Sequence, residues 1–253
     1  MKILLLATNS ETTNILINSL KSSFDVEVIF EEKVSKINFW RRRFLNQGFL
    51  RTLNQILFLL FIQSLKPLYL KNKYSFFARE KFFLIDSGDI KIRNVKSINS
   101  DDSIDLISTI AADIILINGT RILSKKLLDS IKADFINIHC GVTPKYRGVH
   151  GGYWAAYSQD FDNLGVTIHK VDKGVDTGEI IFQEKVEYSS SLNYFIYPLK
   201  QYSIAIPNLI KILRNFSVEG VFTTFYRNDL PSKLWYHPTL TSYLHGLIFR
   251  GIK

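Results

Sequence analysis

The chain has 253 residues, 46% of them hydrophobic and 22% charged, which is ordinary globular usage and excludes wholesale disorder. Its formal net charge of +9 suggests an acidic partner such as nucleic acid, an anionic membrane or a phosphorylated substrate. Residues 31–80, however, contain ten basic and three acidic residues, which leaves a net charge of only +2 for the remainder. The basic character is therefore a local feature and not a property of the whole fold.

Cysteine content and apolar runs bear on the cellular compartment. A single cysteine, Cys140, excludes an intramolecular disulfide and fits a reducing environment. The N-terminal apolar run breaks at residues 8–11, too early for a signal peptide. The longest apolar stretch, residues 56–62, is far shorter than the ~20 residues that span a bilayer. We expect a cytoplasmic protein, and contact with the inner membrane surface stays open.

The beginning of the chain reads as a strand, a helix and a strand, over residues 2–7, 11–21 and 26–30. That order is typical of a parallel α/β sheet. No Gly-x-Gly-x-x-Gly follows the first strand, so the pattern does not support a dinucleotide site.

Residues 33–86 interrupt this rhythm, and we interpret them as an insertion between early strands. They contain a basic cluster at residues 40–43, a helical pattern over 49–65, and an aromatic, lysine-rich stretch over 69–83. One hypothesis is a basic amphipathic surface that contacts an anionic membrane leaflet. The alternative, which we favour at this point, is a helical flap or dimer contact with a solvated basic face.

The α/β alternation then resumes and ends in a long helix. Strands are predicted over residues 90–95, 113–118, 135–139, 166–171 and 180–186, and helices over 103–111, 124–131, 152–157 and 192–216. Pro198 fits the first turn of the last helix, Pro207 predicts a kink, and the tail 218–253 reads as irregular. We predict an α/β fold with a Rossmann-like, mostly parallel sheet flanked by helices, a helical basic insertion and a small C-terminal extension. The expected domain division is 1–190 and 191–253.

A polar pair ends the predicted strand over residues 135–139. Asn137 and His139 are two residues apart and so point to the same face, at the strand edge where open α/β sheets bind ligands. On spacing alone, the pair more often satisfies backbone groups of the next loop. A second segment changes this balance, because a strand over 165–171 leads into a glycine-containing acidic loop that brings Asp176 toward His139. A carboxylate orients an imidazole and raises its pKa, and an amide can donate to an oxyanion.

Four motifs occur in order: Asn137-Ile138-His139, Pro144-Lys145-Tyr146-Arg147-Gly148, Gly165-Val166-Thr167-Ile168-His169 and Asp176-Thr177-Gly178. Together they resemble the 10-formyltetrahydrofolate-dependent formyltransferase family, firmly over about residues 114–186. The family includes transferases that act on glycinamide ribonucleotide, methionyl-tRNA and sugar nucleotides. Val142-Thr143-Pro144 departs from the usual Leu-Leu-Pro, and this departure leaves the acceptor open.

The resemblance implies a catalytic domain over residues 1–190 and catalytic roles for Asn137, His139 and Asp176. An amine attacks the formyl carbon on a folate nitrogen, and Asn137 donates to the negatively charged oxygen. His139 removes the amine proton or helps to stabilise charge, while Asp176 orients His139 and assists proton transfer to the leaving nitrogen.

The resemblance also implies two binding regions. For 10-formyltetrahydrofolate, the expected cofactor-binding residues are Gly119, Arg121, Ile122, Leu123, Asp172 and Gly174. Ordinary helix-cap packing is an equal explanation for the two aliphatic residues, and solvation for the arginine. For the acceptor, the expected residues are Lys145, Tyr146, Arg147, Gly148 and His150, where backbone amides at a helix start plus a guanidinium suit a pyrophosphate. A plain glycine-rich turn is the alternative.

Histidine spacing does not predict a metal site, because the five histidines form no compact ligand pattern. His169 is interpreted as structural, and His237 and His245 are not assigned a function.

The acceptor expected from the resemblance is a nucleotide-linked amino sugar of surface polysaccharide synthesis. The tail after residue 218 is short for the separate C-terminal domain of the tRNA enzyme, and glycinamide ribonucleotide transferases lack such an insertion. An alternative of another class is hydrolysis of formyltetrahydrofolate, and a non-enzymatic folate- or membrane-binding module is a further one. We expect a homodimer, no nucleic-acid partner, and leave peripheral membrane contact through the insertion open.

Overall fold

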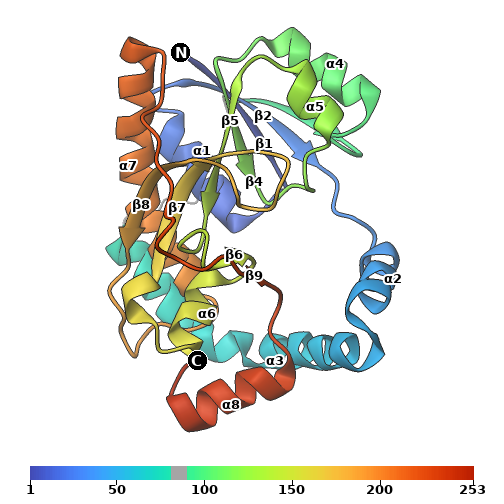
Figure 1. Cartoon of the computed structure of the whole chain (residues 1–253), viewed down its shortest axis with the longest axis vertical. Helices are drawn as coiled ribbons and strands as arrows, with labels where there is room; N and C mark the ends of the chain where they lie inside the picture. Colours follow the sequence, from blue (N-terminus) through green and yellow to red (C-terminus); the bar gives the residue numbers. More distant parts are fainter. Residues whose placement is uncertain (81–89) are drawn as a thin grey trace.

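A seven-stranded sheet forms the centre of the computed structural model, which describes residues 1–80 and 90–253 (Figure 1). The strand order is β3-β2-β1-β4-β5-β7-β8. The strands are β1 (Lys2–Ala7), β2 (Asp25–Glu31), β3 (Lys91–Val95), β4 (Ile114–Asn118), β5 (Asp134–His139), β7 (Gly165–Lys170) and β8 (Ile180–Lys185). The first five are parallel to one another, whereas β7 runs antiparallel to β5 and β8 antiparallel to β7. The predicted mostly parallel α/β fold is therefore confirmed.

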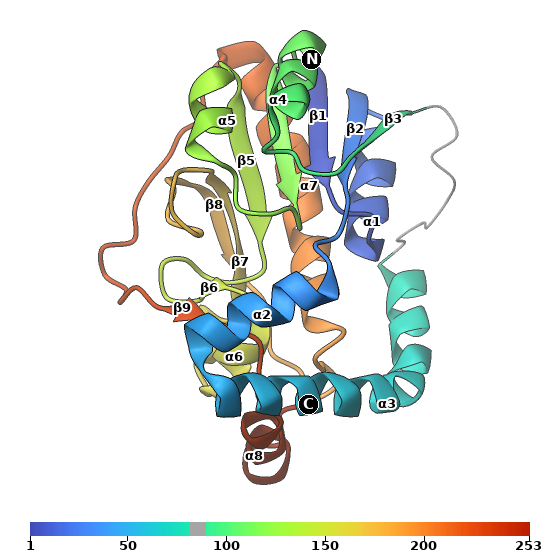
Figure 2. The same ribbon diagram turned by 90° about the vertical axis from the view of Figure 1, so that its right-hand side faces the viewer.

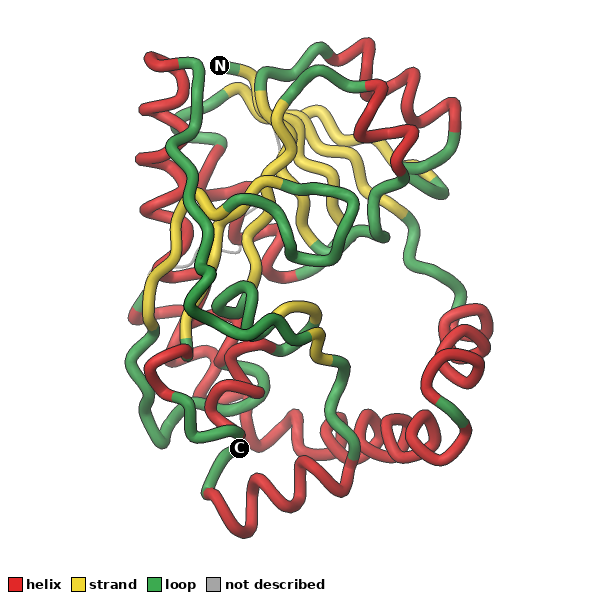
Figure 3. Tube along the Cα trace, viewed as in Figure 1, coloured by secondary structure: helices red, strands yellow, loops and turns green. Residues whose placement is uncertain are grey.

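Helices cover both faces of this sheet, which explains why its central strands lack a polar alternation. Every residue of β4 is buried, as are Ile3–Ala7 of β1. One face packs on α1 (Glu11–Leu20) and α7 (Tyr197–Glu219), and the other on α4 (Asp101–Ile110) and α5 (Lys125–Ser130). Figures 1 and 3 show these two layers on either side of the strands.

The insertion is present and helical. It consists of α2 (Lys36–Gln47) and α3 (Phe49–Arg79), which lie between β2 and β3 in the chain and away from the sheet in Figure 2. The helix predicted over 49–65 is longer than expected, because α3 continues through Pro67 into the stretch that looked merely aromatic and lysine-rich. The last residues of the predicted insertion, 81–86, lie outside the described residues.

The C-terminal part differs from the prediction in one respect. Pro198 lies in the first turn of α7, as expected, and α7 continues as a helix past Pro207, where the kink stays a prediction. The tail predicted to be irregular contains β9 (Leu234–Trp235) and α8 (Leu240–Arg250), and α8 packs against α3. Thr239 caps the start of α8 in a capping box with Ser242. The division at residue 190 stays a prediction.

Three short elements complete the chain beside the end of β5. They are β6 (Arg147–Gly148), which pairs with β9, α6 (Gly151–Tyr157) and a single 3₁₀ turn (Phe161–Asn163). Within the described parts of the chain, no helix combines the length and apolarity needed to cross a membrane.

Candidate active site

The polar pair predicted at the end of β5 is there, and β7 adds a third polar side chain. In the antiparallel register between these strands, Asn137 pairs with His169 and His139 with Thr167. Residues paired across two strands point to the same face, so His169 joins Asn137 and His139. The Asn137 amide nitrogen lies 3.3 Å from Nε2 of His169.

Asp176 completes the cluster from the loop after β7. Its Oδ2 lies 3.3 Å from Nδ1 of His139, and its Oδ1 lies 3.4 Å from the Asn137 amide nitrogen and 3.5 Å from Nε2 of His169. The Gly148 N–H also donates to Oδ2, at 2.8 Å. Asp176 has a positive φ of 51°, an uncommon conformation for a residue other than glycine and one often found at functional sites.

Asp176 is ionised at neutral pH. Burial alone would raise the pKa of its carboxyl, but the neighbouring His139 and His169 and the Gly148 amide together hold this pKa well below its usual range. The cluster therefore contains one fixed negative charge that faces two imidazoles.

The tautomer of His139 follows from its hydrogen bond. Nε2 lies 2.6 Å from the Tyr146 carbonyl oxygen, which can only accept, so Nε2 carries a proton. Burial lowers the pKa of His139 below its usual value, although Asp176 and the same carbonyl oppose the shift. At neutral pH the ring is thus neutral with a free electron pair on Nδ1, and a proton taken up there would face the Asp176 carboxylate. This arrangement suits a general base.

His169, interpreted from the sequence as structural, contacts two of the three predicted catalytic residues. Its Nδ1 donates to the Lys170 carbonyl oxygen at 2.7 Å, which leaves Nε2 to accept from the Asn137 amide. The pairing register of β5 and β7 places His169 beside Asn137, and the sequence alone does not specify that register.

Two of the predicted acceptor-binding residues have other contacts. The Tyr146 side chain is buried and its hydroxyl donates to Asp160 at 2.7 Å, while Lys145 pairs with the same carboxylate at 2.6 Å. The contribution of Tyr146 to the site is its carbonyl oxygen, which positions His139.

Gly141 lies directly against this contact. A Cβ at Gly141 would come within 2.4 Å of the Tyr146 carbonyl oxygen and 2.6 Å of Nε2 of His139. We expect Gly141→Ala to displace the imidazole, to destabilise the protein by about 1–3 kcal/mol, and to lower turnover beyond what its loss of stability explains. Chemical denaturation and turnover well below the melting temperature check this. The comparison is Gly220→Ala, which carries backbone strain at a φ of 72° but has no atom within 4 Å, so it should lose stability without a specific loss of turnover. Full turnover of Gly141→Ala would show that the imidazole is free to move.

At the predicted anion site at the start of α6, several polar groups have partners within the protein. The Arg147 guanidinium donates to the Val175 carbonyl oxygen at 3.1 Å, and the Gly148 N–H is bonded to Asp176. Gly151 and Gly152 are buried, and the Gly152 N–H donates to the Cys140 carbonyl oxygen. The glycine-rich segment thus makes a close turn that holds the Asp176 loop, and the anion site stays a prediction.

His150, the fifth predicted acceptor-binding residue, points into a buried polar cluster. Its Nε2 lies 2.8 Å from the Tyr194 hydroxyl and 3.0 Å from Nδ1 of His237. Burial lowers the pKa of His150 well below its usual value and that of His237 to about 4, with the nearby Arg43 lowering both further. The cluster joins the start of α6 to the C-terminal tail, so His237, not assigned from the sequence, makes a structural contact.

The lowered pKa of His237 predicts acid sensitivity. The unfolded state binds a proton at His237 near pH 6.5, whereas the folded state does so only near pH 4, so stability is lost as the pH falls between these values. From pH 7 to pH 5 this one group should cost about 2 kcal/mol. Urea denaturation at both pH values checks this, and His237→Gln should reduce the dependence while the exposed His245→Gln should not. An unchanged slope in His237→Gln would contradict the assignment.

The predicted cofactor-binding residues lie in two loops on one side of the sheet. Buried Leu123 belongs to the apolar cluster on which Val171 packs, and Ile122 is exposed. Gly119 follows β4 with a φ of 72°. In the second loop, Asp172 accepts from the Gly174 N–H and from Thr177.

Arg121 is held by protein groups. Its backbone N–H and its guanidinium both donate to the buried Glu31 carboxylate, at 2.8 and 3.0 Å, and the guanidinium also donates to the Lys96 and Glu32 carbonyl oxygens. The guanidinium thus ties its loop to the end of β2, and the structure offers no support for the expected pairing with a folate carboxylate. A cavity of about 440 Å³ lies beside it, lined by Asn9, Phe30, Glu31, Glu32, Lys33 and Asn94.

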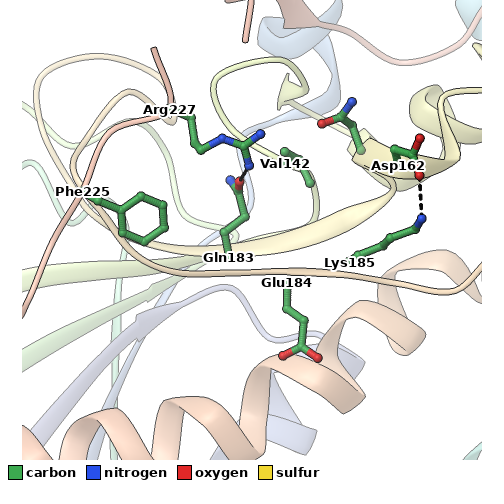
Figure 4. A pocket seen from close by; sticks show the side chains of 8 residues that line it. Val142, Asp162, Gln183, Glu184, Lys185, Phe225 and Arg227 are labelled. Carbon is green, nitrogen blue, oxygen red and sulfur yellow. Dashed lines mark hydrogen bonds and ion pairs between the residues drawn. The ribbon is translucent and has the colours of Figure 1, made fainter. Parts of the chain in front are cut away.

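A second cavity, of about 160 Å³, lies against β8 (Figure 4). Arg227 donates to Gln183 there at 2.9 Å, and Lys185 pairs with Asp162 at 2.7 Å. Gln183 in turn donates to the carbonyl oxygen of Thr143 and to Thr167. Arg227, Lys185 and Asp162 thus have partners within the protein, and Gln183 holds the Thr143 loop. The residues that line this cavity do not include the predicted catalytic residues. No group of three or more metal-ligating side chains occurs among the residues that the structure describes.

Comparison with known proteins agrees with the motifs. Residues 75–192 match the formyl transferase family, Formyl_trans_N. A methionyl-tRNA formyltransferase of Desulfotalea psychrophila is 30% identical over 102 residues, which are 40% of this chain and 31% of that protein. The match spans about a third of the length of such curated relatives.

Solved structures share the fold. A phosphoribosylglycinamide formyltransferase from Anaplasma phagocytophilum matches with a TM-score of 0.56 and 18% identity, covering 95% of this chain and 97% of that one. The sugar 3N-formyl transferase WlaRD, solved in the presence of dTDP and 5-N-formyl-THF, matches with a TM-score of 0.53 and 18% identity, covering 93% and 69%. The predicted resemblance to the formyltransferase family is confirmed.

Proposed function

We propose that this chain is a formyltransferase that moves a formyl group from 10-formyltetrahydrofolate to the amine of a nucleotide-linked amino sugar. The observation that carries the proposal is the cluster at the carboxyl end of β5, where Asn137, His139 and Asp176 meet within 3.4 Å. The match of residues 75–192 to the formyl transferase family supports it, because all three residues lie in that segment.

In this proposal each residue of the cluster has one task. As the acceptor nitrogen bonds to the formyl carbon, the Asn137 amide donates to the oxygen on which negative charge develops. His139 takes the amine proton at Nδ1, and the ionised Asp176 stabilises the resulting imidazolium at 3.3 Å. The proton then passes to the folate nitrogen as the bond between that nitrogen and the formyl carbon breaks. The products are tetrahydrofolate and the formylated amine.

His169 is the positioning residue of the cluster. Its protonated Nδ1 is held by the Lys170 carbonyl oxygen, and its Nε2 accepts from the Asn137 amide and so orients that side chain. The loops with Gly119–Leu123 and Asp172–Gly174 remain our proposal for the folate site, since they flank the cluster on one side of the sheet, and Ile122 supplies an exposed apolar side chain there.

The similarity of fold to WlaRD, described as a sugar 3N-formyl transferase and solved with dTDP, supports the amino sugar, and the phosphoribosylglycinamide formyltransferase matches the fold equally well. Methionyl-tRNA is the second candidate, because a curated methionyl-tRNA formyltransferase is 30% identical to this chain over 102 residues. The homodimer, the link to surface polysaccharides and the domain division at residue 190 stay predictions.

A turnover screen tests the acceptor. The purified chain is mixed with 10-formyltetrahydrofolate and a set of amino-sugar nucleotides, and tetrahydrofolate release is followed together with the mass of the product. We expect formylation of at least one sugar nucleotide and none in the Asp176→Asn variant. Transfer to methionyl-tRNA alone would replace the first candidate by the second, and formate release without any amine would indicate a hydrolase.

A further inference from the structure

Helix α3 has a buried stripe on one side and an exposed apolar stripe on the opposite side. Thr52, Gln55, Phe58 and Ile62 form its buried stripe toward the protein. A second stripe, the leucine stripe, is between 39% and 81% exposed and consists of Leu50, Leu53, Leu57, Leu60 and Leu68. At about 100° per residue these leucines lie together on the side of α3 opposite the buried stripe. Five leucines in one exposed row are not needed for folding, and such a patch marks a contact surface.

Helix α2 also has exposed apolar and basic side chains. Ile37, Arg41 and Leu45 are spaced by four residues and are exposed, so one face of α2 also mixes apolar and basic side chains. α2 packs on α3, and Figure 2 shows both helices on the side of the molecule that faces the viewer.

The charge of this surface has one sign. No aspartate or glutamate occurs between Glu32 and Glu80. The exposed charged side chains described on the two helices are basic, namely Arg41, Arg42, Arg51 and Lys66. At about 100° per residue, Arg51 and Lys66 lie on the side of α3 away from the leucine stripe, whereas Arg41 and Arg42 lie on the adjacent α2. An exposed apolar row with arginines on the adjacent helix is a chemistry that binds the headgroup region of an anionic bilayer.

We propose that α2 and α3 form a peripheral docking surface for an anionic phospholipid bilayer, in which the leucine stripe enters the interface and the arginines contact lipid phosphates. Two other occupants fit the surface less well. A two-fold contact with a second copy would place cations against cations. A nucleic acid would neutralise the arginines but leave the leucines in water.

Vesicle co-sedimentation of the full chain tests the proposal. We expect binding to vesicles of phosphatidylglycerol and phosphatidylcholine, little binding to phosphatidylcholine alone, and release at about 1 M salt, where the screening length falls to about 3 Å. Equal binding to both vesicle types, or no binding to either, would overturn the proposal.

Paired variants separate the two parts of the surface. Arg41→Gln with Arg42→Gln should weaken binding about 25-fold, since each basic residue near an anionic surface contributes about fivefold. Leu50→Gln with Leu60→Gln should weaken it by at least about tenfold. The matched controls are Lys125→Gln with Lys132→Gln and Val218→Gln with Val221→Gln, which change exposed residues elsewhere and should bind normally.

Sedimentation of the same proteins without lipid tests whether this surface binds a second copy of the chain instead of a bilayer. The melting temperatures of the leucine variant and the wild-type chain should agree, because the exchanged side chains are exposed. If the leucine exchanges abolish self-association and leave vesicle binding intact, the surface is a contact between copies and the proposal is wrong. Equal loss of vesicle binding in the control variants would likewise contradict it.

Discussion

Asp176→Asn is expected to lower formyl transfer by about 10³–10⁴-fold while the protein stays folded. The asparagine side chain has the same shape, and its oxygen can still accept from the Gly148 N–H, so the loop is preserved. It lacks the negative charge that lies 3.3 Å from Nδ1 of His139, which the proposed mechanism needs when the imidazole takes up a proton. The loss should appear in kcat, with KM for both substrates little changed.

The control for this exchange is Asp105→Asn, which removes one exposed carboxylate from α4 and should leave turnover unchanged. A second measurement is the acid dependence of stability. Because the pKa of Asp176 is lowered on folding, its contribution to stability is present above about pH 4 and is lost as the pH falls further. Normal turnover in Asp176→Asn would remove this residue from the mechanism.

His139→Gln is expected to lower turnover by about 10²–10⁴-fold. A glutamine amide can keep the hydrogen bond to the Tyr146 carbonyl oxygen, but it has no basic nitrogen to take a proton from the acceptor amine. The comparison is His245→Gln, because His245 is an exposed histidine on α8 whose ring contacts the Tyr157 hydroxyl. Its turnover should equal that of the wild-type chain.

The pH profile of kcat/KM distinguishes a base from a merely structural histidine. Burial lowers the pKa of His139, so its neutral form persists below the usual value of about 6.5 and the acid limb of the profile should lie below that pH. The limb should vanish in His139→Gln. If the variant keeps the same limb, another group is the base.

Local patterns predicted most of the fold. The strands around Asn137 and His169 were placed within one or two residues, because both are short, largely buried runs rich in apolar residues between polar loops. The tail was the main error. α8 has only Tyr243 and Gly246 buried, and it packs against α3, a helix far earlier in the chain, so its place depends on a distant partner.

The candidate site was predicted in part, for a similar reason. Asn137 and His139 share a face because strand side chains alternate, which holds whatever the rest of the chain does. The contact with Asp176 was expected from the resemblance and is present at 3.3 Å. His169 was missed, because its place beside Asn137 depends on the register of two strands 32 residues apart.

The sequence by itself determined the order of α/β elements, the polar pair at the end of β5 and the sign of the charge on the insertion, because these depend on spacing and composition alone. Only the tertiary structure decided what each polar group contacts. In the tertiary structure His150 contacts His237, Arg121 donates to Glu31, and the leucine stripe of α3 is exposed. The physical reason is that hydrogen bonds and burial are set by partners distant in the chain, whose identity no local pattern contains.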